Sequence, residues 1–216
     1  DMAKIKAGGT ELESEISGPE DGTPFLFING FGSQMTSWPH QFFDGLANAG
    51  MRVLRFDNRD VGLSQKWHGI LPDIREAMKA ARAGGKPDVP YTLDEMAADA
   101  AGLLNALGIE TAHISGCSMG GMIAQLVALN HPEKARSLIS IFSTTSDPSL
   151  PPSSKEAAEA LTARPPSTDR ETVVAHSVKG RRTYASTAWP FDEEHWKMIA
   201  GRAYDRAYYP EGTIRQ

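Results

Sequence analysis

The chain has 216 residues, of which 40% are hydrophobic and 23% charged, with a formal net charge of −5. This composition is typical of a globular protein with a sizeable core, and it excludes a collagen-like, coiled-coil or wholly disordered chain. The acidic balance argues against general nucleic-acid binding, and no apolar run approaches the roughly 18 residues that span a membrane. The single cysteine, Cys117, permits neither an internal disulfide nor a cysteine-rich zinc site, so we expect a cytoplasmic protein.

Short apolar runs alternate with helical patterns through residues 1–142. Strands are expected at Pro24–Ile28, Met51–Phe56, Ala112–Ser115 and Ser137–Phe142, and helices near Trp38–Asn48, Thr92–Leu107 and Met119–Asn130. The helix at Thr92 is the best defined, because a capping box starts it and Gly108 ends it. This alternation, with nearly continuous apolar strands, predicts an α/β fold with a parallel sheet covered on both faces.

The composition changes at residue 143, where a segment rich in Ser, Thr and Pro predicts a linker. Three further helices are expected near Ser154–Ala163, Asp169–Ser186 and Asp192–Tyr208. Aromatic residues are frequent in this part of the chain. We therefore expect an α/β core of residues 1–142, followed by a linker and helical cap, or lid, of residues 143–216.

The most informative motif is G-x-S-x-G, which the chain carries at residues 116–120. The motif lies between an apolar strand and an amphipathic helix, the context in which it forms a nucleophile elbow. The glycines avoid clashes with the neighbouring strand and helix, so that the Ser118 hydroxyl stands clear of the sheet. The pattern therefore predicts that Ser118 is a catalytic nucleophile.

This segment also allows two other interpretations. Ser118 followed by glycines also fits a simple helix cap, although the strand–turn–helix context favours the elbow. Cys117 is a rival nucleophile, but its neighbour occupies the exposed tip of the turn. We expect the Cys117 thiol to be buried and structural.

A glycine-rich loop, Asn29–Ser33, follows the strand at Pro24–Ile28. An acyl-transfer enzyme needs two backbone N–H donors where the substrate carbonyl oxygen becomes negative. In this architecture one donor follows the nucleophile and the other comes from this loop, which predicts Met119 and Phe31. A dinucleotide site is the alternative, but Met35 stands where its third glycine belongs.

Three motifs resemble those of the α/β-hydrolase superfamily, in that family's order. The loop at residues 29–32 is similar to the family's oxyanion loop, with Asn29 replacing the usual His, and residues 116–120 form the elbow. Residues 57–64 are similar to the family's D-x-R-G-x-G-x-S turn, with Asp60 in place of the first Gly. The resemblance implies that Asp57 and Arg59 shape this turn and are not catalytic.

The chain looks most like the aclacinomycin methylesterase-like branch of that superfamily. The features that carry this likeness are the Arg59-Asp60 variant and the segments Ser37-Trp38-Pro39 and Trp189-Pro190-Phe191-Asp192. The branch implies a serine hydrolase that cleaves small esters under a helical lid.

A serine nucleophile needs a base and an orienting acid, which in this family follow the cap in the chain. Neither a strand that ends in Asp nor a Gly-His turn follows the cap in this sequence. A pairing of Asp147 with His176 or His195 is the self-sufficient alternative. We expect instead that a second polypeptide or a C-terminal segment supplies the Asp and the His.

These residues together predict a carboxylic-ester hydrolase that works through an acyl-enzyme on Ser118, with the N–H groups of Phe31 and Met119 as oxyanion hole. No cofactor and no metal are expected, and the partners are a small-molecule ester and the segment that carries the acid and base. A catalytically silent ligand-binding protein is the rival from another class. A perhydrolase or a C–C bond hydrolase of the same fold is the closer rival.

Overall fold

The computed structural model describes residues 2–216 and divides them into two compact units. The first unit runs to residue 145 and also includes residues 209–216, and the second comprises residues 146–208. The sequence had assigned the last eight residues to the cap. They lie with the core because Arg215 and Gln216 bond to Asp60 and Arg59, in the turn that follows the strand at Met51–Phe56.

A six-stranded sheet forms the centre of the first unit, in the order β1-β2-β4-β3-β5-β6. Its strands are β1 (Met2–Ala7), β2 (Thr10–Ser17), β3 (Thr23–Ile28), β4 (Met51–Phe56), β5 (Ala112–Cys117) and β6 (Ala135–Ile141). Strands β4, β3, β5 and β6 are mutually parallel, whereas β1 and β2 form an antiparallel hairpin that pairs with β4. The predicted mostly parallel sheet is confirmed.

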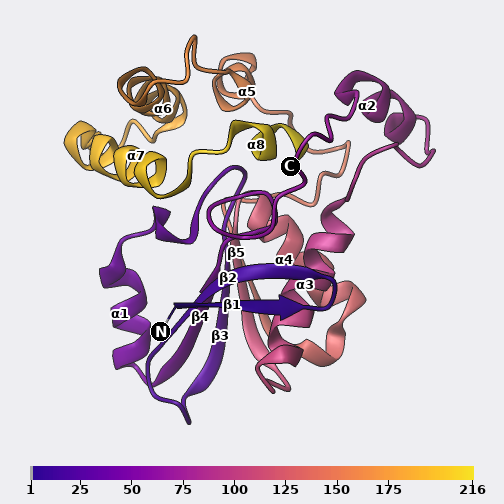
Figure 1. The fold of residues 1–216 in the computed structure, drawn as a ribbon, viewed down its shortest axis with the longest axis vertical. Coiled ribbons are helices and arrows are strands. Elements are labelled where there is room, and N and C mark those ends of the chain that lie inside the picture. The colour runs from indigo at the N-terminus through magenta and orange to yellow at the C-terminus, as the bar shows by residue number, and fades with distance from the viewer. Residues whose placement is uncertain (1) are drawn as a thin grey trace. The chain divides into compact units, whose positions relative to one another are not determined.

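Helices cover both faces of this sheet, as Figure 1 shows. They are α1 (His40–Asn48), α3 (Leu93–Ala106) and α4 (Met119–Asn130), with α2 (Ile74–Arg82) and the short α8 (Pro210–Arg215) near the loops. Strand β3 alternates between two apolar clusters. Phe25 and Phe27 pack with α1, whereas Leu26 and Ile28 pack with α3 and α4.

Local signals account for the helix ends. Thr92 caps α3, and a reciprocal bond from the Thr92 N–H to Glu95 completes the predicted capping box. Gly108 has a φ of +67°, the left-handed conformation that ends a helix. The β1–β2 hairpin, α2 and α8 were not predicted, although the apolar–polar alternation of residues 2–7 before Gly8-Gly9 is a hairpin signal.

The second unit consists of three packed helices, α5 (Lys155–Thr162), α6 (Arg170–Tyr184) and α7 (Glu193–Ala207). All three lie where the sequence predicted them. Val178 and Ile199 are its buried apolar residues. The guanidinium of Arg181 stacks over the Trp196 ring at 4.3 Å, and Arg170 pairs with Asp205 on the surface.

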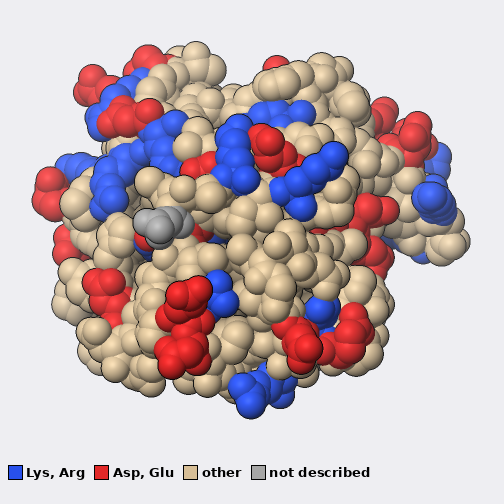
Figure 2. All heavy atoms as spheres, turned by 60° about the horizontal axis from the view of Figure 1, so that its bottom comes forward, with Lys and Arg blue, Asp and Glu red and all other residues tan. Residues whose placement is uncertain are grey.

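Figure 2 shows that both acidic and basic side chains occur on the face that it draws. Within residues 2–216, no helix combines the length and the apolar character that crossing a bilayer would require.

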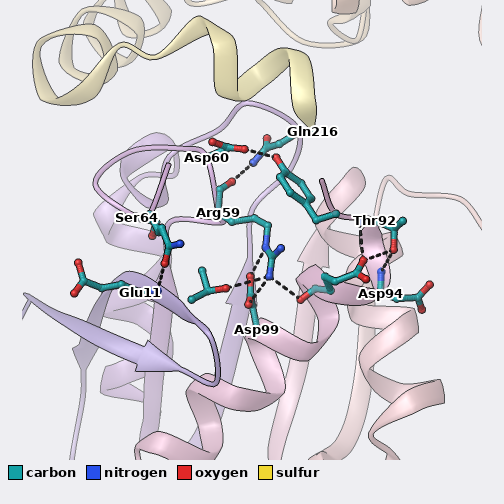
Figure 3. Close-up of polar contacts among 12 residues, drawn as sticks. Glu11, Arg59, Asp60, Ser64, Thr92, Asp94, Asp99 and Gln216 are labelled. Carbon is teal, nitrogen blue, oxygen red and sulfur yellow. Dashed lines mark hydrogen bonds and ion pairs between the residues drawn. The ribbon is translucent and has the colours of Figure 1, made fainter. Parts of the chain in front are cut away.

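Two buried ion pairs hold the turn after β4. Arg59 forms a forked pair with Asp99 of α3, with N–O distances of 2.7 and 2.8 Å. Asp60 pairs with Arg215 of α8 at 2.8 and 2.9 Å, and both side chains are fully shielded from solvent. Figure 3 shows Arg59 reaching Asp99 and Asp60 lying above them. The turn is thereby fastened to two helices that are distant in the chain.

The environment of Asp60 favours its carboxylate form. Burial alone raises the pKa of Asp60. Hydrogen bonds from Arg215, the Trp67 N–H and Tyr91, together with the charge of Arg215, outweigh burial and hold that pKa below its ordinary value of 3.8. Asp60 therefore stabilises the folded state above its ordinary pKa, and this contribution is lost as the pH falls through the lower pKa of the folded state.

We predict that Asp60→Asn lowers the free energy of unfolding by about 3–5 kcal/mol at pH 7, because it leaves the buried Arg215 charge unpaired. Asn tolerates the φ of +66° at this position, so the backbone is not disturbed. Urea unfolding between pH 7 and pH 3 measures the effect, which should shrink at the acid end. The control is Glu11→Gln, which breaks an exposed pair with Lys4 and should cost less than about 1 kcal/mol. Equal losses in the two variants would contradict the prediction.

Candidate active site

Ser118 occupies a sharp turn between β5 and α4. Its φ of +54° and ψ of −123° lie outside the regions that a non-glycine residue ordinarily adopts. Such a conformation costs about 1–3 kcal/mol and persists only when the surroundings enforce it. Here they do, because the Ser118 carbonyl accepts bonds from the N–H of Gly121 and from the Ser143 hydroxyl. The strand–turn–helix context expected from the sequence is present, with Ser118 half-buried at its tip.

Glycines make this turn sterically feasible. A Cβ on Gly116 would overlap the carbonyl oxygen of Gly120, and a Cβ on Gly120 would overlap that of Ile28. The start of α4 therefore packs directly against the ends of β5 and β3. The side chain of Cys117 points into the cluster with Phe25 and is buried, as expected.

The loop after β3 lies against the elbow. Ile28 pairs with Gly116 across the parallel strands, so both segments leave the sheet at the same level. Gly30 then passes so close to Ser118 that a Cβ there would lie 3.2 Å from the Ser118 Cβ. Within residues 2–216, no acceptor is recorded for the backbone N–H of Phe31 or of Met119. Phe31 follows Gly30 and Met119 follows Ser118, so both N–H groups belong to the two segments that meet here.

Asn29 stands where the oxyanion loop of α/β-hydrolases usually has a histidine, and it is fully buried. Its carbonyl accepts a bond of 3.0 Å from the Asn58 side chain, which ties the loop to the turn after β4. Its own side-chain amide has no partner among residues 2–216. The backbone of Asn29, not its side chain, therefore holds this part of the loop.

Asp57 shapes the turn after β4, the role that the resemblance implies. Its carboxylate accepts from the N–H of Met35 at 2.8 Å and from the N–H of Leu63 at 2.9 Å. These bonds join the segment after the oxyanion loop to the turn itself.

The C-terminal residues meet the same loop, which the sequence did not predict. The Gln216 side chain accepts from the Gly32 N–H at 2.9 Å and donates to the Arg59 carbonyl at 2.7 Å. Hydrogen bonding to Asp60 raises the pKa of Arg215, so its charge is permanent. Nothing in the local sequence signals this contact, because the paired residues lie more than 150 positions apart.

The four histidines of the first unit have neighbours other than Ser118. His40 lies near Arg55, His68 near Tyr209 and His113 near Ser137, while His131 ends α4. Among the described residues of the first unit, no hydrogen bond joins a histidine to Ser118. Residues 2–216 contain no group of three His, Cys, Asp or Glu side chains that could hold a metal ion.

The alternative acid and base lie in the second unit. The Asp147 carboxylate accepts from the Ser149 N–H, and Ser149 lowers the pKa of Asp147. His176 lies on α6 beside the Ala163 carbonyl, and His195 lies on α7 beside Trp196. The pairing of Asp147 with either histidine stays a prediction.

Known proteins share this sequence pattern and fold. A family model described as alpha/beta hydrolase fold matches residues 23–197. Rhodomycin D methylesterase DauP of Streptomyces sp. (strain C5) is 36% identical over 127 residues, which make up 59% of this chain and 37% of that protein. Rhodomycin D methylesterase DnrP of Streptomyces peucetius is 35% identical over 127 residues, with the same coverage of both chains. The match thus spans little more than a third of the length of these two relatives.

A solved structure extends the likeness to the fold. The 2-hydroxy-6-oxo-6-phenylhexa-2,4-dienoate hydrolase BphD from Rhodococcus sp. strain RHA1 superposes with a TM-score of 0.71 at 18% identity. The superposition covers 98% of this chain and 67% of that one.

We predict that Gly116→Ala abolishes the elbow, because the added methyl group collides with the Gly120 carbonyl. The expected loss is at least about 3 kcal/mol of unfolding free energy, comparable to severe overpacking. The matched control is Gly45→Ala in α1, where an added Cβ meets nothing within 4 Å. That variant should gain about 0.5–1 kcal/mol from helix propensity. Denaturant unfolding of the two variants measures both effects, and a fully stable Gly116→Ala protein would refute the steric argument.

Proposed function

This chain belongs to the alpha/beta hydrolase fold family, and on that premise we propose that it is a serine hydrolase that cleaves a carboxylic ester through an acyl-enzyme on Ser118. The single observation that carries the proposal is the strained conformation of Ser118 at the tip of a strand–turn–helix elbow. The likeness to two rhodomycin D methylesterases supports an ester as the substrate class.

The proposed chemistry begins with attack by the Ser118 oxygen on the ester carbonyl carbon, while a base takes the hydroxyl proton. We propose that the N–H groups of Phe31 and Met119 stabilise the negative oxygen that forms. This assignment is supported because both belong to the segments that meet at Ser118 and neither has an acceptor among residues 2–216. The C–O bond to the leaving alcohol then breaks, and the alcohol receives the proton. Water attacks the acyl group with the help of the same base, and Ser118 regains its proton as the acid leaves.

We propose that the base and its orienting acid come from a segment outside these 216 residues. The edge of the sheet at β6 supports this, because its apolar side chains Leu138 and Ile139 are 43% and 40% exposed. An exposed apolar edge strand is a template for pairing with a further strand. A segment that pairs with β6 would cover these side chains and bring an Asp and a His to the elbow.

The helical unit of residues 146–208 is proposed as the lid of the site. Its exposed apolar side chains support this role, since Trp189 is 77% exposed and Met198 49% exposed. Such a lining would suit an ester with an apolar acyl or alcohol group.

We predict that Ser118→Ala reduces kcat by about 10⁶-fold in the protein that carries the proposed segment, because no other group takes over the attack. The loss of kcat is measured from the rate at which a methyl ester releases its alcohol. Cys117→Ala is the matched control, because it removes the neighbouring nucleophile, whose thiol is buried. Loss of turnover in Cys117→Ala, with retention in Ser118→Ala, would reverse the assignment of the nucleophile.

A further prediction concerns the 216 residues alone. Without a base, Ser118 keeps its proton and attacks slowly, so this chain should hydrolyse an activated ester such as p-nitrophenyl acetate no faster than its Ser118→Ala variant. Light scattering during the assay establishes the oligomeric state. Rapid, Ser118-dependent turnover by a monomer would disprove the need for another segment and would favour Asp147 with His176 or His195.

A further inference from the structure

We propose that Gln216, anchored through Arg215, is a positioning residue for the oxyanion loop, and that its side-chain amide fixes Gly32 and thereby the N–H of Phe31. This inference rests on the proposed function and names the part of the chain that controls the geometry of its oxyanion hole.

The Gln216 amide joins two loops that leave the sheet at neighbouring strands. Its Oε1 accepts from the Gly32 N–H, in the loop after β3, at 2.9 Å. Its Nε2 donates to the Arg59 carbonyl, in the turn after β4, at 2.7 Å. Figure 3 shows the Gln216 side chain directed at the Arg59 carbonyl. The two loops are therefore held at a fixed separation by one side chain.

The bridge needs a side chain that donates and accepts at the same time, and the Gln216 amide does both. The carboxylate of a glutamate is an acceptor alone, and an aliphatic side chain provides neither a donor nor an acceptor. The chemical identity of residue 216 therefore matters at both ends of the bridge.

Arg215 anchors the bridge at its base. Its side chain is fully shielded from solvent and makes a two-pronged pair with Asp60, while its third nitrogen donates to the Ile70 carbonyl at 2.8 Å. A planar guanidinium held at three nitrogens has little rotational freedom. The residue that follows Arg215 in the chain is consequently presented to the oxyanion loop in one orientation.

The oxyanion loop is sensitive to a shift at Gly32. This residue has a φ of +62°, and a Cβ on it would lie 3.1 Å from the Thr213 methyl group of α8. On the other side of Phe31, Gly30 lies against Ser118. Phe31 thus stands between one residue pressed against the elbow and another held by α8, and these two contacts fix the direction of its N–H.

The test compares Gln216→Met, which removes both hydrogen bonds at similar volume, with Gln216→Glu, which keeps the acceptor for Gly32. Removing an oxyanion donor lowers kcat by roughly 10²–10³-fold. A displaced donor should cost less, so we expect kcat to fall on the order of tenfold in Gln216→Met, with KM within about twofold of the parent. The kcat of Gln216→Glu should lie between that of the parent and that of Gln216→Met. The assay uses the protein with the segment that supplies the base.

Gln65→Met is the matched control. The Gln65 side chain also accepts a bond from a backbone N–H, that of Glu11 at 3.0 Å. Among residues 2–216 its side chain makes no hydrogen bond to the oxyanion loop. This variant should keep the parental kcat. A loss of kcat in Gln65→Met equal to that in Gln216→Met would overturn the proposal, because general destabilisation would then explain both.

Amide hydrogen exchange supplies a measurement that does not depend on turnover. In Gln216→Met the peptide of residues 29–34 should exchange at least several-fold faster, and in Gln65→Met at the parental rate. Unchanged exchange in Gln216→Met overturns the inference even if kcat falls. If Ser118→Ala keeps full activity, the proposed function fails by itself, and the exchange rates still decide whether Gln216 holds the loop.

Discussion

The pairing of Ile28 with Gly116 across parallel strands β3 and β5 sets the geometry on which the rest of the site depends. Because the strands are in this register, the oxyanion loop and the elbow begin at the same level of the sheet. The next contacts follow from it, since Gly120 packs on the Ile28 carbonyl and Gly30 on Ser118. A side chain at either glycine would force the two segments apart.

A second layer of contacts holds these loops from the outside. Asp60 has a φ of +66°, a strained conformation for a non-glycine residue. The family's D-x-R-G-x-G-x-S turn has glycine at this position. The Asp60 carboxylate accepts hydrogen bonds from Arg215, from the Tyr91 hydroxyl and from the Trp67 N–H, and these groups form one cluster. Loss of either Asp60 or Arg215 would leave the charge of the other buried and unpaired. The pair therefore holds α8 against the turn after β4, and Gln216 connects both to the oxyanion loop.

The features that could be predicted from the sequence are those that depend on a few neighbouring residues. The capping box at Thr92 located α3, and the glycines around Ser118 located the elbow, because each acts over a few residues. Other features, among them α2, were not predicted. The β1–β2 hairpin is mostly polar and exposed on one side, and α8 has only six residues. The bond of Gln216 to Gly32 joins residues 184 positions apart, and no local pattern encodes a contact of that kind.

Acylation of Ser118 is the step on which the proposed reaction depends. Its most direct test is to treat the protein that carries the acid and base segment with a fluorophosphonate and to map the adduct by peptide mass spectrometry. We expect one rapidly formed adduct, on Ser118, whose formation an ester substrate slows by competition. An adduct on Cys117 or on another serine, or no rapid adduct in a protein that hydrolyses esters, would contradict this expectation.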